Sequence, residues 1–213
     1  MNVLTIVTGY NTPGKHDATG AFLPEARAFL GLHCRTVATD GHANPEGGWL
    51  EYVSPQTPAK RRFLAETTIR GMPGLDILAA FGHGTARSLI VTGHKTANIA
   101  SFADSIRTSG AKTVVLYACS TALGREGFAD RLADLLPGVN VWAHTAAGHT
   151  TWNPNTELAG GPRRGDPIAR PGDPLWKRWR ERMATDQAFR LSFWLGAVGL
   201  DRSAALEVVR AAV

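Results

Sequence analysis

Short, continuous apolar runs recur along the first two thirds of this chain, and longer stretches with helical spacing separate them. Five runs have the length and composition of strands: VLTIVT at 3–8, CRTVAT at 34–39, LDILAAF at 75–81, TVVLYA at 113–118 and VNVWA at 139–143. Runs without polar alternation are typical of strands that are buried on both faces, and such sheets are mostly parallel. The runs therefore predict a mostly parallel sheet.

Amphipathic stretches lie between these runs and predict helices. They span 19–31, 58–71, 96–110 and 126–138. In the third stretch, apolar residues share one helical face, and they are Ile99, Phe102, Ala103 and Ile106. Helices that alternate with parallel strands cover both faces of the sheet, so the predicted fold class is α/β. The segment 40–57, which is rich in Gly, Pro and Asn, is predicted to be a long loop.

The length of 213 residues suffices for one α/β domain with an appendage. We expect the α/β domain at 1–150, a loop or linker at 151–173, and a C-terminal helical extension at 174–213 that packs on the same domain. The linker is predicted from its many prolines and glycines. The extension combines basic and aromatic residues.

Composition restricts the class of protein. A hydrophobic content of 44% with 19% charged residues is typical of a folded globular chain, and two cysteines are too few for a disulfide scaffold. The N-terminus, MNVLTIVTGYN, lacks a basic region and is predicted to be a core strand rather than a signal peptide. No apolar run approaches the roughly 18 residues of a membrane span. We expect a cytoplasmic protein without a membrane span, and export by a route without a signal peptide stays open.

Two residues with catalytic chemistry follow the third and fourth predicted strands. His83 lies between two glycines in ILAAFGHGT, and Cys119 ends the apolar run of KTVVLYACST. Because the carboxyl ends of parallel strands meet at one edge of the sheet, we expect His83 and Cys119 to face each other there. A cysteine attacks as a thiolate, and a histidine beside it can carry the proton. The backbone amides of Gly84 and Cys119 are candidates for binding an oxyanion.

The order ILAAFGHG…VVLYAC resembles the caspase-like (clan CD) cysteine peptidases, which include caspases, legumain, gingipains, separases and clostripain. The resemblance covers roughly residues 1–150 and implies a caspase-like fold. It implies that the protein is a cysteine endopeptidase acting on a protein or peptide through an acyl-enzyme. It maps His83 to the catalytic histidine, Cys119 to the nucleophile, and Gly84 to the glycine whose amide helps form the oxyanion hole. That chemistry needs no metal and no organic cofactor.

The resemblance also implies where a substrate pocket would lie, namely in the loops 9–19, 120–126 and 144–155. The pocket candidates in these loops are Asp17, Ser120 and His144. The loops carry charged residues of both signs, so the residue preferred before the cleaved bond stays open.

A structural role for the cysteine is one alternative, because unpaired cysteines are among the most buried residue types. Cys34 has no histidine partner in the sequence and is predicted to be a core residue. A second alternative is a caspase-like scaffold or binding module without catalysis. In that case the basic, aromatic helices from Trp176 to Trp194 are a candidate docking site for a protein partner, although a helical cap packed on the domain is the favoured interpretation.

Two further patterns point elsewhere. The stretch GYNTPGKH at 9–16 matches the phosphate-binding pattern G-x-x-x-x-G-K, but His16 stands where the magnesium-binding Ser or Thr belongs. A P-loop-like nucleotide binder is therefore the less favoured alternative. Histidines 83, 94, 144 and 149 would gather near the carboxyl edge, yet no metal-binding motif accompanies them, and no metal is predicted. The basic stretch 161–182 is compatible with binding to nucleic acid, an anionic surface or an acidic partner, but a solvated basic helix and linker is the favoured interpretation, and nucleic acid is not the expected partner.

Overall fold

The computed structural model describes residues 2–8, 22, 26, 29, 30, 37–39, 48–53, 57–124, 126–145 and 156–160. Cys34, the candidate Asp17 and the extension predicted at 174–213 lie outside these described residues. The strand expected at 34–39 and the helix expected at 19–31 are described only in part.

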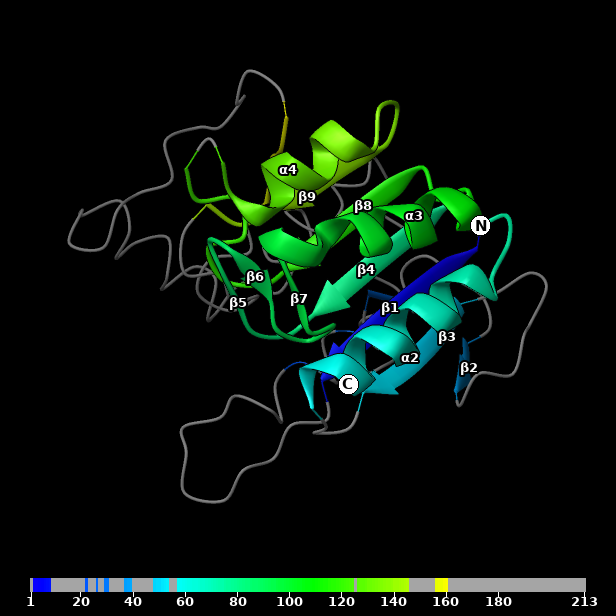
Figure 1. The fold of residues 1–213 in the computed structure, drawn as a ribbon. Helices are drawn as coiled ribbons and strands as arrows, with labels where there is room; N and C mark the ends of the chain where they lie inside the picture. The colour runs from blue at the N-terminus through cyan, green and yellow to red at the C-terminus, as the bar shows by residue number, and fades with distance from the viewer. Residues whose placement is uncertain are drawn as a thin grey trace, which may run out of the picture.

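A seven-stranded sheet forms the centre of the fold (Figure 1). The strands are β1 (Val3–Thr8), β2 (Val37–Thr39), β3 (Gly48–Val53), β4 (Ile77–Phe81), β8 (Thr113–Tyr117), β9 (Asn140–Ala143) and β10 (Glu157–Leu158). Their spatial order is β10-β9-β8-β4-β1-β3-β2, and every neighbouring pair is parallel except β9 and β10. The predicted α/β class with a mostly parallel sheet is confirmed.

Two sequence predictions about this sheet are wrong. The segment 40–57 is not a continuous loop, because Gly48–Val53 form β3 between β1 and β2. Its sequence GWLEYV is rich in aromatic and β-branched residues, and pairing with a strand on each side outweighs the loop-like composition that precedes it. The linker predicted at 151–173 contains β10, where the N–H of Ala159 donates to the carbonyl of Val141 over 2.8 Å.

Helices α2 (Pro58–Arg70), α3 (Ile99–Ser109) and α4 (Phe128–Leu135) lie together on one face of the sheet (Figure 1). They confirm the predictions at 58–71, 96–110 and 126–138, and a 3₁₀ turn, η1 (Thr96–Asn98), precedes α3. Proline follows the N-cap Thr57 of α2, and Gly110 ends α3 at φ 76° in the left-handed region that favours glycine. No helix within the described residues has the length and apolar character to cross a membrane.

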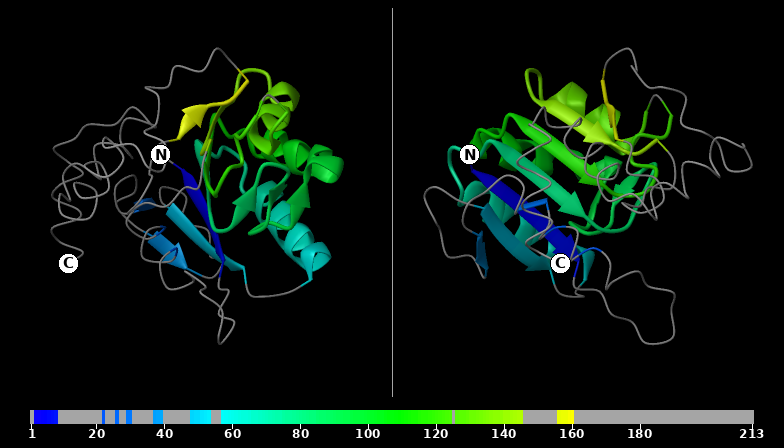
Figure 2. Two further views of the ribbon diagram at one scale, coloured as in Figure 1. Left: turned by 90° about the vertical axis from the view of Figure 1, so that its left-hand side faces the viewer. Right: turned by 180° about the vertical axis from the view of Figure 1, so that it is seen from behind.

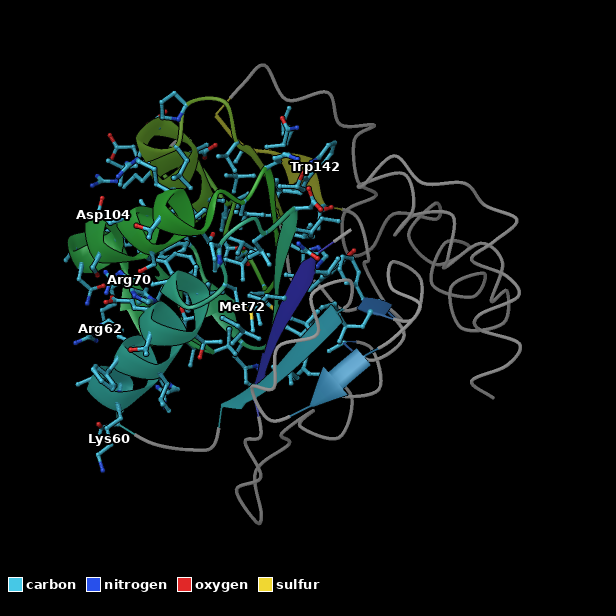
Figure 3. The ribbon with its side chains drawn as sticks, turned by 90° about the vertical axis from the view of Figure 1, so that its right-hand side faces the viewer. Lys60, Arg62, Arg70, Met72, Asp104 and Trp142 are labelled. Atoms are coloured by element: carbon cyan, nitrogen blue, oxygen red, sulfur yellow. The ribbon has the colours of Figure 1, made fainter. Side chains whose placement is uncertain are left out.

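Apolar residues cover both faces of the sheet. Along β1, Leu4 and Ile6 pack with α2, α3 and α4, while Val3 and Val7 face the other side. On that other side lie four buried residues, Phe22, Ala26, Phe29 and Leu30, whose backbone is helical. Figure 2 shows helices α2, α3 and α4 on one side of the sheet. In Figure 3, Arg62 and Asp104 lie on this helical side, and Trp142 lies on the opposite side. Helical segments therefore cover both faces, as the sequence predicts.

A second, small antiparallel sheet follows β4 directly, and no sequence pattern predicted it. Its strands are β5 (Gly84–Thr85), β6 (Ser88–Leu89) and β7 (His94–Lys95), in that spatial order. Figure 1 shows it beside the carboxyl end of β4. Gly93, before β7, adopts φ 73°, and a Cβ there would lie 2.3 Å from the carbonyl oxygen of Pro58. The turn into β7 therefore needs glycine for both its dihedral and its contact with α2.

Candidate active site

The segments that carry His83 and Cys119 leave the sheet side by side. Strands β4 and β8 are parallel neighbours, and their register ends with Phe81 opposite Tyr117. One residue further on, the N–H of Gly82 donates to the carbonyl of Tyr117 over 3.2 Å. His83 and Cys119 therefore follow adjacent strand ends at the carboxyl edge, as expected from the sequence.

Gly84 packs directly against the backbone that holds Cys119. A Cβ on Gly84 would lie 2.7 Å from Cγ2 of Thr121, 2.8 Å from Cβ of Ala118 and 3.0 Å from the carbonyl oxygen of Cys119. Ordinary carbon–carbon contacts are about 3.5–4.0 Å, so no side chain fits at this position. The contact shows that the His83–Gly84 turn and residues 118–121 form one packed unit.

His83 and Cys119 both keep part of their surface exposed. The imidazole of His83 meets the buried ring of Phe22 edge-to-face, with ring centroids 5.3 Å apart. The carbonyl of His83 accepts from the N–H of Ile90 over 2.9 Å, which extends the pairing of β5 with β6. His83 and Cys119, which the sequence predicted as the candidate pair, thus lie partly exposed at the carboxyl edge of the sheet.

The turn after Cys119 is tight and well supported. Ser120 has φ 57° and is the one non-glycine residue with positive φ in the described part of the chain. Its carbonyl accepts from the N–H of Leu123 over 2.9 Å. The buried hydroxyl of Thr121 donates to the carbonyl of Ala118 over 3.0 Å, and the carbonyl of Thr121 accepts from Ala129 of α4. Strained backbone of this kind is held only where its surroundings determine it.

The pocket candidates differ in their placement. Ser120 is partly exposed beside Cys119, whereas the side chain of His144 is buried, 1% exposed, just after β9. The carbonyl of His144 accepts from the N–H of Ala122 over 2.8 Å, and its ring lies 5.9 Å from that of Tyr117. His144 therefore supports the turn after Cys119 through its backbone.

His94 does not join His83 at the exposed edge. Its side chain extends from β7, is fully buried, and contacts α2 and α3. Its Nε2 lies 3.0 Å from Oε1 of Glu66. Within the described residues, no three His, Cys, Asp or Glu side chains come together in a way that could hold a metal ion. Sequence reasoning did not find the partnership of His94 with Glu66, because the two residues are 28 positions apart and no motif connects them.

Fold and site together define an α/β domain with a histidine and a cysteine after neighbouring parallel strands. The family model of a domain of unknown function (DUF8616) matches residues 54–158, from just before α2 to the end of β10. The match spans just under half of the 213 residues and includes both His83 and Cys119. No curated protein and no solved structure is significantly similar to the chain.

Proposed function

We propose that this protein is a caspase-like cysteine endopeptidase in which His83 and Cys119 form the catalytic dyad. The observation that carries the proposal is the packing of Gly84 against Ala118, Cys119 and Thr121. That contact joins the two short motifs at the edge of the sheet where α/β folds bind their ligands. The parallel pairing of β4 with β8 and the partial exposure of His83 and Cys119 support it further.

The proposed reaction proceeds through a thioester. Sγ of Cys119 attacks the carbonyl carbon of a peptide bond, and the proton of its thiol passes to His83. The backbone amides of Gly84 and Cys119 stabilise the developing oxyanion. The carbon–nitrogen bond then breaks, and His83 protonates the departing amine. Water hydrolyses the thioester, which releases the carboxylate product and restores the thiol.

Selective alkylation tests the dyad. An ordinary thiol with a pKa of about 8.5 is only roughly 3% thiolate at pH 7, so an activated cysteine reacts with iodoacetamide about tenfold faster or more. The measurement compares full-length Cys34→Ala, in which Cys119 is the remaining thiol, with full-length Cys119→Ala. We expect faster labelling of Cys119, and we expect His83→Ala in the Cys34→Ala background to slow it. Equal rates for the two thiols would overturn the proposal.

Turnover separates a peptidase from an inactive scaffold. Fluorogenic peptides with Arg, Lys, Asp, Asn or Leu before the cleaved bond cover the main preferences of the resembling family. Cleavage that disappears in Cys119→Ala supports the peptidase. If every peptide stays intact although Cys119 labels rapidly, the reactive thiol serves another reaction, and the endopeptidase assignment is wrong.

A further inference from the structure

A buried hydrogen-bond chain joins the small sheet to the helices behind it. Nδ1 of His94 lies 2.8 Å from Oγ1 of Thr92, and Nε2 lies 3.0 Å from Oε1 of Glu66 on α2. The hydroxyl of Ser101 on α3 donates to the same Glu66 oxygen over 2.6 Å. The side chains of Thr92 and His94 are both fully buried, and the His94 ring lies 4.6 Å from that of Phe102.

Burial and the nearby charges together set the protonation of these hydrogen-bonded side chains. Burial lowers the pKa of His94, and the nearby Arg62 lowers it further, although Glu66 acts in the opposite direction. Burial raises the pKa of Glu66, but hydrogen bonds from Ser101 and His94, together with the charge of Arg70, leave it below its ordinary value. At neutral pH, Glu66 is therefore ionised and His94 is neutral.

This protonation decides which way each hydrogen bond runs. The ionised carboxylate of Glu66 only accepts, so Nε2 of His94 carries the hydrogen and Nδ1 accepts. The hydroxyl of Thr92 must then donate its hydrogen to Nδ1 of His94. That hydrogen is no longer directed at the carbonyl of Leu89, which lies 3.3 Å from the Thr92 hydroxyl oxygen. If His94 gained a proton, Nδ1 would donate to Thr92, and the Thr92 hydroxyl would turn to Leu89.

The register of the small sheet connects this chain to the candidate dyad. His94 of β7 pairs with Leu89 of β6, and Leu89 pairs with Gly84 of β5. The three residues thus form one row across the sheet, and Gly84 at its end packs against Cys119. The other end of the row is fixed to α2, where the guanidinium of Arg62 also donates to the carbonyl of Gly93 over 3.0 Å.

We propose that Thr92, His94 and Glu66 are positioning residues that hold the His83–Gly84 turn against Cys119. The proposal rests on the proposed function, because it assigns the three residues to the geometry of that dyad. They do not touch the substrate. They act through the row from His94 to Gly84, and loss of the hydrogen bonds would let the turn shift relative to the thiol.

Two substitutions at Thr92 separate the hydroxyl from the shape of the side chain. Full-length Thr92→Val removes the hydroxyl at nearly constant volume, and Thr92→Ser keeps it. In the Cys34→Ala background, we expect Thr92→Val to slow iodoacetamide labelling of Cys119 about three- to tenfold, and Thr92→Ser to stay near the parent rate. Ile106→Val is the matched control, because Ile106 is fully buried on α3 but is not one of the hydrogen-bonded residues Thr92, His94, Glu66 and Ser101.

Glu66→Gln is the second variant, and it keeps the test decisive if Thr92→Val does not fold. The ¹⁵N signals of the His94 ring report the loss of the Glu66 carboxylate directly. We expect altered His94 signals together with slower labelling and a changed pH profile of the labelling rate. Altered His94 signals with unchanged labelling would overturn the positioning role.

The two proposals fail in different ways. If Cys119 of the parent labels no faster than Cys34, the dyad is wrong, and positioning is then read from the backbone amide shifts of Gly84 and Cys119. Shifts in Glu66→Gln and Thr92→Val that are absent in Ile106→Val support the mechanical connection. Amide shifts no larger than those of the control refute it, whatever the labelling shows.

Discussion

Alanine at position 84 is the sharpest perturbation that the structure offers. The added Cβ would sit 2.7 Å from Cγ2 of Thr121 and 2.8 Å from Cβ of Ala118, about 1 Å inside ordinary contact. Neither neighbour can swing away. Ala118 has no side-chain torsion that moves its Cβ, and Thr121 is buried with its hydroxyl bonded to the carbonyl of Ala118. Relief therefore requires movement of the backbone that carries Cys119.

Overpacking that displaces backbone costs about 1–3 kcal/mol in the free energy of unfolding. For a domain of this size, Gly84→Ala should lower the urea midpoint by about 1 M with an unchanged slope. Labelling of Cys119 should slow as well. Gly71→Ala is the matched control, since Gly71 ends α2 at φ −71° and its nearest neighbour is the Thr67 carbonyl at 3.3 Å. The control should change the free energy of unfolding by about 0.5 kcal/mol or less.

A double variant tests the stated cause. Thr121→Ser removes Cγ2, the closest contact, and retains the hydroxyl bond to Ala118. The combined loss in Gly84→Ala/Thr121→Ser should be smaller than the sum of the single losses by about 0.5–1 kcal/mol. A midpoint for Gly84→Ala equal to that of Gly71→Ala, or strict additivity in the double variant, would refute the packing of Gly84 on residues 118–121.

Three other predictions concern single features of the described structure. Ser120→Gly should raise the free energy of unfolding by about 0.5–1 kcal/mol in urea titrations, because glycine adopts φ 57° without the cost of a Cβ; a loss of stability would contradict this. Burial lowers the pKa of His94 below its ordinary 6.5, so the unfolded chain binds the proton more readily. The stability that depends on neutral His94 is therefore present above pH 6.5 and is lost progressively as the pH falls from 6.5 toward the lower pKa of the folded state. The urea midpoint should thus fall on acidification, and less steeply in His94→Gln than in the parent. Asp130→Ala removes the carboxylate that accepts from the N–H of Gly160 over 3.1 Å and should speed hydrogen exchange at Gly160, whereas Asp130→Asn should keep most of the protection.

The sequence predicted those parts of the fold whose signals are local. The apolar run at 3–8 became β1 with identical bounds, and the helix predicted at 96–110 formed with Gly110 as its left-handed cap. The strand β3 was missed because Gly, Pro and Asn before it resemble a loop, and its stability comes from pairing with β1 and β2, which no local pattern records. The two-residue strand β10 likewise depends on β9 for its existence.

For the candidate site too, the sequence predicted some features and missed others. Adjacent placement of the His83 and Cys119 segments follows from chain order and parallel topology, which the apolar runs predicted. The contact of Gly84 with residues 118–121 depends on the absence of a side chain, so the glycine was visible in the sequence although its neighbours were not. The hydrogen bonds from Thr92 through His94 to Glu66 join a turn of the small sheet to the earlier helix α2. No local sequence pattern indicates these contacts, so only the structure reveals them.

Two separate sets of contacts therefore hold the His83–Gly84 turn. On one side the turn packs against the backbone of residues 118–121, and on the other it is held through Leu89 and His94 by α2. The first set fixes distance, because it is limited by van der Waals contact with groups that cannot rotate away. The second connects the turn to α2 through paired strands and the hydrogen bond between His94 and Glu66, which is the connection that we propose positions the turn. His83 and Cys119 are partly exposed, so in the proposed dyad the backbone contacts of both segments would contribute to the precision with which the two side chains are placed.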